Sequence, residues 1–179
     1  MWLFHKTTVL SRSGLLKGMV DCHSHLLPGV DDGVQSMEES LQILREMEQQ
    51  GIRRVWLTPH IMEDIPNETL ALQRKFRELL QQYRGAVELK LAAEYMLDNL
   101  FEERLEKEDL LLLEEGKRFL LVETSYFNPP MDLLSVLQRI QKKGYYPLLA
   151  HPERYEYMQK EDYNTLKAVS YTHLTLPTT

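Results

Sequence analysis

Apolar side chains recur at helical spacing after Ser36, where Leu41 and Leu44 fall on one face of a largely polar segment. Ser36 followed by Glu39 has the capping-box pattern of a helix N-terminus, in which the two residues satisfy each other's backbone N–H groups. Gly51 is well placed to end the helix, because glycine readily takes the left-handed backbone found there. The pattern therefore predicts a helix between Ser36 and Gly51.

The same spacing predicts three further helices. They cover residues 68–84, part of 100–116, and 132–143. Asn67 can cap the first of them, and Gly85 follows it. Lys142 and Lys143 lie in the last turn of the third, where positive charge interacts favourably with the helix dipole.

Short segments rich in β-branched and aromatic residues alternate with these helices and predict strands. They are residues 21–25, 52–60, 87–95, 118–126 and 145–155, the last with its following loop. Strands that alternate with helices favour a parallel sheet with helices outside, open or closed as a barrel. The sequence contains no tandem repeat, low-complexity tract or linker that would divide it.

Composition narrows the function classes. A chain of 179 residues suits one domain or part of a larger barrel, and its net charge of -6 argues against binding a nucleic-acid backbone. No apolar run is long enough to span a membrane, and residues 1–15 are interpreted as a leader before the first strand. Cys22 is the single cysteine, so an internal disulfide is excluded and a cytoplasmic location is compatible. On an alternating strand Cys22 faces away from His23, which predicts a buried packing role.

All five predicted strands end in side chains that bind metals. These are His23 with His25, then His60, Glu94, Glu123 and His151. In parallel barrels the carboxyl ends of the strands form one rim, and active sites are built there. A single histidine pair could lie by chance on an edge strand, but the repetition at every strand end indicates a metal site.

Histidine combined with carboxylates suits Mn²⁺, Fe²⁺ or Zn²⁺, and this many ligands indicates two or three ions. Such ions activate water and clamp the oxygens of a group being displaced, which favours phosphoester hydrolysis. Arg154 can grip a phosphoryl group, although pairing with Glu153 or Glu156 at the surface is the alternative. A cysteine-based phosphatase is excluded, because the residue six past Cys22 is Pro28 and not arginine.

Five segments together resemble the PHP (polymerase and histidinol phosphatase) superfamily, and most closely its manganese-dependent protein-tyrosine phosphatases linked to capsular and exopolysaccharide synthesis. They read DCHSHLLPGVDDG, TPH, AAEYMLDN, LLVETSYFNPP and LLAHPERY. The resemblance covers residues 16–169 and implies an α/β fold, a distorted (β/α)7 TIM-like barrel with three metal ions, of which about five βα units are present. By matching positions it implies the metal ligands His23, His25, Asp32, His60, Glu94, Glu123 and His151, and Arg154 as the phosphate-contacting residue. Asp31 stays open as a substitute for Asp32.

The resemblance also implies a reaction and a partner. Mn²⁺ is the expected ion, and the expected substrate is phosphotyrosine in the tail of a membrane-anchored kinase that controls polysaccharide export. A phenolate leaves readily, so a strong general acid is dispensable. Histidinol phosphate, an amide or cyclic ester, and a non-catalytic metal-binding scaffold remain alternatives, and oligomerisation stays open.

The end of the sequence departs from the resemblance. Residues 170–179, SYTHLTLPTT, match nothing expected, and the last βα units with their Asp-x-His pair are missing. We interpret this tail as a truncated reading frame or a junction with foreign sequence, and give His173 no role. A barrel without its last strands is expected to expose apolar surface and to be weakly active.

Overall fold

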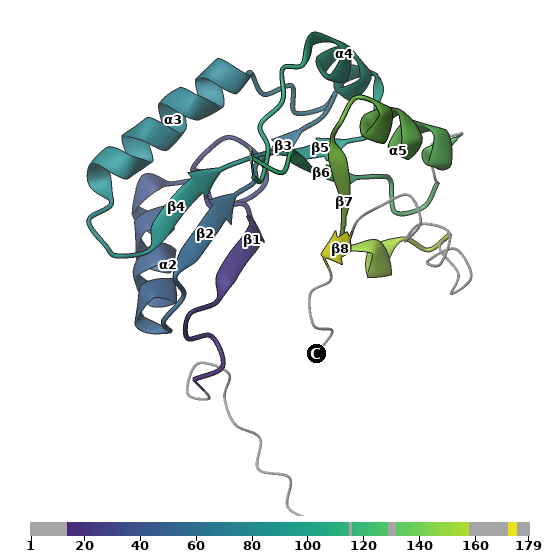
Figure 1. The fold of residues 1–179 in the computed structure, drawn as a ribbon. Coiled ribbons are helices and arrows are strands. Elements are labelled where there is room, and N and C mark those ends of the chain that lie inside the picture. Colours follow the sequence, from purple (N-terminus) through teal and green to yellow (C-terminus); the bar gives the residue numbers. More distant parts are fainter. Residues whose placement is uncertain (1–13, 115, 129–131, 158–171, 175–179) are drawn as a thin grey trace, which may run out of the picture.

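The computed structural model describes residues 14–114, 116–128, 132–157 and 172–174, which form a curved row of strands with helices on its outer side (Figure 1). The strands are β1 (Val20–Ser24), β2 (Arg54–Leu57), β3 (His60–Ile61), β4 (Glu88–Leu91), β5 (Glu94–Met96), β6 (Phe119–Glu123), β7 (Tyr146–Ala150) and β8 (Thr172–Leu174). The helices are α2 (Met37–Gln49), α3 (Thr69–Gln82), α4 (Asn99–Lys107), α5 (Leu133–Lys142) and the short 3₁₀ helix η1 (Pro152–Arg154). Within these residues, every helix is too short or too polar to cross a membrane.

Every strand pair is parallel, as the alternating pattern predicts. One sheet has the order β1-β2-β4 and the other β3-β5-β6-β7-β8. The expected strand at 87–95 is broken in two, and the run at 52–60, expected to stop at Thr58 and Pro59, continues after them as β3. The first break falls at Thr58 and Pro59, where proline has no N–H to donate to a ladder. Hydrogen bonds still cross the breaks, from Glu94 N to Pro59 O (3.1 Å) and from Ala92 N to Leu57 O (2.9 Å). The row is therefore continuous and consistent with an incomplete barrel.

The predicted helices are present, but one cap is wrong. Ser36 Oγ accepts a hydrogen bond from Glu39 N at 3.2 Å, which confirms the start of α2. Helix α3 instead begins after Glu68, which makes no side-chain cap. The Asn67 side chain is used elsewhere, because its amide donates to Val30 O (2.8 Å) and His60 O (2.9 Å). Asn67 thus ties the loop at Val30 to the segment that carries His60.

Alternation along the strands divides the apolar residues into two cores. In β6, Leu120 and Val122 pack in the larger core with the helices, whereas Leu121 belongs to a smaller core inside the row of strands. Side chains two residues apart share a face, so a single strand serves both cores. The smaller core consists of Ala92, Leu113, Leu121, Leu148 and Ala150, with Trp56 and Phe119 packed against it.

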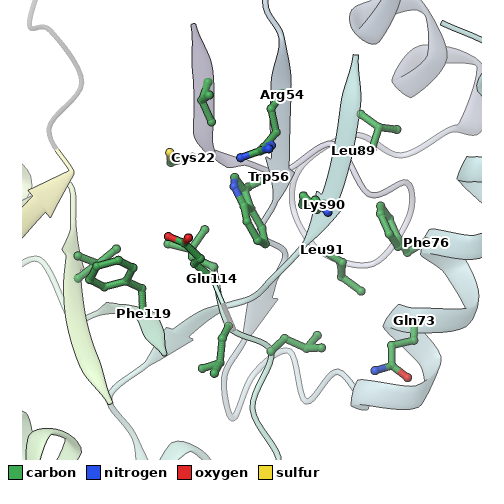
Figure 2. Close-up of a pocket in the computed structure, with 15 residues that line it drawn as sticks. Cys22, Arg54, Trp56, Gln73, Phe76, Leu89, Lys90, Leu91, Glu114 and Phe119 are labelled. Atoms are coloured by element: carbon green, nitrogen blue, oxygen red, sulfur yellow. The ribbon is translucent and has the colours of Figure 1, made fainter. Parts of the chain in front are cut away.

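The inner side of the row also contains a cavity of about 970 Å³ (Figure 2). Cys22, Trp56 and Phe119 line it. Cys22 is half-buried rather than buried, which corrects the expectation from the sequence. The reason is that β1 pairs only with β2 among the described residues, so one side of β1 is uncovered.

The two ends of the chain lie mostly outside the description. Residues 1–13 of the expected leader are not among the described residues, and neither are 170–171 and 175–179 of the tail. Within the tail, Thr172–Leu174 form β8, which adds to the row beside β7 in parallel register.

Candidate metal centre

The two histidines of the DCHSH motif meet in one cavity. His23 lies in β1 and His25 directly follows it. Their Nε2 atoms are 3.2 Å apart, and both approach one oxygen of Glu94, at 2.9 Å from His23 and 3.2 Å from His25. The period-two spacing therefore brings both rings to the same point, which is the juxtaposition that the sequence predicts.

Glu94 lies at the middle of the cluster and its side chain is fully buried. Its Oε2 is also 3.4 Å from His60 Nδ1, and its Oε1 is 3.0 Å from His151 Nε2. Burial alone would raise the pKa of Glu94, but hydrogen bonds with His151, His23 and His25 outweigh it and lower the pKa. A charged carboxylate is thus held among four imidazoles from three segments of the chain.

Glu123 and His151 complete the inner wall. Glu123 ends β6, and its Oε2 lies 3.5 Å from His151 Nε2. His151 follows β7 with a φ of 30°, a left-handed conformation that non-glycine residues rarely adopt. Such backbone strain persists where the surrounding structure imposes it, commonly at functional sites. The strain at His151 turns its ring into the cluster instead of along the strand.

Several buried polar atoms in the cluster lack hydrogen bonds within the described part of the chain. His60 Nδ1 and Glu123 Oε1 are 3.0 Å apart, yet their relative orientation does not make a hydrogen bond, and both count as unsatisfied. A hydrogen bond needs a proton aligned between donor and acceptor, and a short distance alone does not make one. Unsatisfied buried polar groups are costly, and a cation between the two atoms would remove that cost.

The donor atoms form groups of the size that a cation needs. Each group has donor atoms within 4.8 Å of one another, and the groups share members. They are His23, His25 and Glu94; His25, Asp32 and His60; and His60, Glu94 and Glu123. Nitrogen and carboxylate donors in this mixture fit Mn²⁺, Fe²⁺ or Zn²⁺ better than Mg²⁺ or Ca²⁺.

Asp31 and Asp32, between which the sequence could not choose a candidate ligand, have different surroundings in the structure. The Asp32 side chain is 77% exposed and its Oδ1 lies 3.5 Å from His60 Nε2, at the open side of the site. The Asp31 side chain is fully buried and its Oδ2 lies 2.9 Å from His25 Nδ1. Asp31 also accepts hydrogen bonds from His60 N and Gly33 N, each at 3.0 Å. Of the two, Asp32 belongs to a group of side chains that could hold a cation, with His25 and His60, and Asp31 contacts the opposite ring nitrogen of His25.

Gly33 belongs to this arrangement for a steric reason. A Cβ atom at Gly33 would lie 2.3 Å from the backbone oxygen of His25. A side chain there would push apart the loop that carries Asp31. In the DDG sequence, Asp31 contacts the His25 ring, Asp32 is exposed, and Gly33 lets its backbone lie close to that of His25.

Arg154 lies at the mouth of the site, on η1, and is exposed. It lines a cavity of about 560 Å³ together with His23, His60 and Tyr126. The pKa of Arg154 is raised, chiefly by a hydrogen bond with Tyr126. Glu153 and Glu94 add to the raised pKa of Arg154 through their negative charge, so the surface pairing with Glu153 stays open as the alternative.

Sequence reasoning missed three residues that shape the site. Asn67 was taken for a helix cap, and Tyr126 was not singled out. Tyr155 was also passed over, although its hydroxyl donates to Ala150 O (2.8 Å) and accepts from Thr124 N (3.3 Å), which joins the ends of β6 and β7. The HPERY segment contains a signal for Tyr155, because a tyrosine so near a strand end often bonds to backbone.

Comparison with known proteins agrees with this geometry. The chain is 33% identical over 150 residues to "Tyrosine-protein phosphatase CpsB" of Streptococcus pneumoniae, which covers 80% of this chain and 60% of that protein. It is 31% identical over 140 residues to "Tyrosine-protein phosphatase YwqE" of Bacillus subtilis (strain 168), covering 76% of this chain and 55% of that one. The chain thus spans well under two thirds of the length of these relatives.

A solved structure is similar as well. It is described as "Crystal structures of YwqE from Bacillus subtilis and CpsB from Streptococcus pneumoniae, unique metal-dependent tyrosine phosphatases", and it matches with a TM-score of 0.74 and 28% identity. The match covers 84% of this chain and 62% of that one. A family model described as "Capsular polysaccharide synthesis, CpsB/CapC" matches residues 19–173. This chain therefore belongs to the CpsB/CapC family of capsular polysaccharide synthesis.

Proposed function

We propose that this chain carries the metal- and phosphate-binding part of a metal-dependent protein-tyrosine phosphatase. The observation that carries the proposal is the Glu94 carboxylate, which lies within 3.4 Å of four histidines from three segments. The proposed ligands of two or three ions are His23, His25, Asp32, His60, Glu94, Glu123 and His151. Mn²⁺ is the ion we propose, with Fe²⁺ or Zn²⁺ as the alternatives that the same donors accept.

When bound, divalent ions lower the pKa of water and neutralise charge on phosphoryl oxygens. The protein's own residues do the positioning. Arg154 holds the phosphoryl group at the mouth of the cavity through its planar guanidinium. Asp31 keeps the Nε2 atom of His25 directed inward by bonding to the opposite ring nitrogen. No general acid is required of the chain, because a phenolate is a good leaving group.

The proposed substrate is phosphotyrosine in a protein, and the proposed partner is the tail of a membrane-anchored kinase of polysaccharide export, met in the cytoplasm. Two findings support this choice. Relatives that resemble the chain over most of its length are named tyrosine-protein phosphatases, and the family is described by capsular polysaccharide synthesis. The site also opens at an exposed rim beside Arg154, where a side chain of another protein can enter.

Metal loading followed by a substrate comparison tests the proposal. Purified chain is loaded with Mn²⁺, its metal content is measured by mass spectrometry, and phosphate release is followed from a phosphotyrosine peptide and from histidinol phosphate. Glu94→Gln is expected to lose bound metal and turnover together. Glu88→Gln is the matched control, because Glu88 is an exposed strand residue that pairs with Arg54 away from the cluster.

The outcomes separate the alternatives. Faster release from the phosphotyrosine peptide in the wild type, lost in Glu94→Gln and kept in Glu88→Gln, supports the proposal. Preference for histidinol phosphate would replace the proposed substrate. Bound metal without release from any phosphoester would indicate a metal-binding scaffold, and a chain that binds no divalent ion would overturn the proposal.

A further inference from the structure

Tyr126 lies at the mouth of the cluster without belonging to the ligand set. It follows β6, three residues after Glu123, and its ring meets the His151 ring edge-on with centroids 5.6 Å apart. Its backbone oxygen accepts a hydrogen bond from Glu156 N at 2.9 Å, which joins the loop to the segment after η1. Tyr126 is therefore fixed against the wall of the site from two directions.

One part of the Tyr126 side chain stays uncovered. Tyr126 is 38% exposed and lines the same cavity as Arg154. Phe127, the next residue, is 68% exposed. The exposed part of the Tyr126 ring and most of Phe127 do not contribute to folding, since that apolar area stays in water. Exposed aromatic surface at the rim of a polar site is instead typical of a binding surface.

The position of the phosphoryl group decides where the rest of a substrate must lie. With the phosphoryl oxygens directed at the buried cluster and at Arg154, the group attached to the ester oxygen has to leave through the mouth of the cavity. Tyr126 stands at that mouth, next to Arg154. An aromatic leaving group would pass beside its ring, whereas a short alkyl group would not reach it. Offset or edge-to-face contacts between aromatic rings are favourable beyond the area they bury.

We propose that Tyr126 is a specificity-determining and positioning residue: its ring packs against the aromatic leaving group of an aryl phosphate, and its hydroxyl holds Arg154 over the phosphoryl group. The inference rests on the proposed function and deepens it, because it names the feature of the chain that distinguishes phosphotyrosine from phosphoserine. It assigns the two effects to different atoms of one side chain. The ring governs the preference for an aryl group, and the hydroxyl governs the grip on any phosphoryl group.

Binding of two phosphonates to the Mn²⁺-loaded chain separates these effects without requiring turnover. Phenylphosphonate and methylphosphonate are titrated calorimetrically, and the preference is the ratio of their dissociation constants. Tyr126→Ala is expected to lower the preference for phenylphosphonate by about three- to tenfold. Tyr126→Phe is expected to keep the preference while weakening both ligands by about two- to tenfold. Leu70→Ala, at an exposed apolar residue of α3, is the control and is expected to change neither quantity.

Each outcome bears on one of the two proposals. If Tyr126→Ala keeps the wild-type preference, or if Leu70→Ala lowers it equally, the role of the Tyr126 ring is overturned while the proposed function stands. If the loaded wild type binds neither phosphonate, the proposed function itself fails. Tyr126→Leu keeps apolar bulk without an aromatic face, so it gives the same test should the alanine variant fold poorly.

Discussion

Replacement of Asp31 by asparagine is the substitution that tests the two aspartates most directly. The buried Asp31 carboxylate accepts from His25 Nδ1 and His60 N through Oδ2 and from Gly33 N through Oδ1. An asparagine has only one acceptor oxygen. Whichever way its amide is turned, the NH₂ group faces at least one donor N–H. The variant therefore keeps the shape of the side chain and loses part of its hydrogen bonding.

The size of the effect follows from these contacts. A buried donor left without a partner costs about 1–3 kcal/mol of folding free energy. Residues that orient a metal-bound histidine change metal affinity by about 10- to 100-fold when replaced. Asp31→Asn is thus expected to lower both the free energy of unfolding and the affinity for Mn²⁺ by these amounts.

Urea unfolding of the metal-free chain and competition with a chelator measure the two quantities. Asp32→Asn is the matched control, because Asp32 is 77% exposed and its Oδ1 lies 3.5 Å from His60 Nε2, too far for a strong hydrogen bond. It is expected to change the free energy of unfolding by less than about 0.5 kcal/mol and still weaken Mn²⁺ binding. Reversed results, with Asp32→Asn destabilising the fold and Asp31→Asn leaving it unchanged, would refute the assigned roles.

Three further predictions concern pH, phosphate binding and the hydrogen bonds of Tyr155. Burial alone would lower the pKa of His25, but its hydrogen bonds and charge interactions with Asp31 and Glu94 outweigh burial and raise the pKa from 6.5 to about 10. The protonated His25 therefore stabilises the fold fully below pH 6.5, and this contribution is lost as the pH rises toward 10. The metal-free chain should lose stability over this interval in urea unfolding, and a flat profile would contradict the ion pair. Arg154→Ala should raise KM for p-nitrophenyl phosphate by about 10- to 100-fold, and Arg154→Lys should recover part of this loss. Glu153→Ala is the control. If it has the same KM as Arg154→Ala, Arg154 does not contact the phosphoryl group. Tyr155→Phe should lower the free energy of unfolding in urea by about 1–3 kcal/mol, because the buried N–H of Thr124 and carbonyl of Ala150 lose their partner. An unchanged midpoint would show that these two hydrogen bonds do not stabilise the fold.

The local sequence pattern was sufficient to predict structure where a residue's neighbours along the chain decide its conformation. The capping box at Ser36 and the alternation of helices and strands are of this kind, and both are confirmed. The convergence of strand ends followed from the parallel order alone, because all carboxyl ends meet on one side. The break at Thr58 and Pro59 has a local signal in the proline, whereas the break at Ala92 and Ala93 has none in the sequence.

Misassignments occurred where a side chain has two uses and only distant contacts choose between them. Asn67 has the chemistry of a helix cap, but carbonyls of Val30 and His60 compete for its amide and take it. Cys22 was expected to be buried, and its exposure depends on what covers β1. In both cases the outcome depends on packing between segments and not on the local pattern.

The order of residues alone determined the parallel α/β fold and the set of groups at the strand ends, because periodicity and strand direction act over short stretches. Tertiary structure decided which aspartate faces the cluster and which orients His25, since their neighbours in sequence are nearly the same. It also decided that Tyr126 and Arg154 share the mouth of the cavity. The physical reason is that burial and distance between segments are properties of packing, which a linear pattern does not contain.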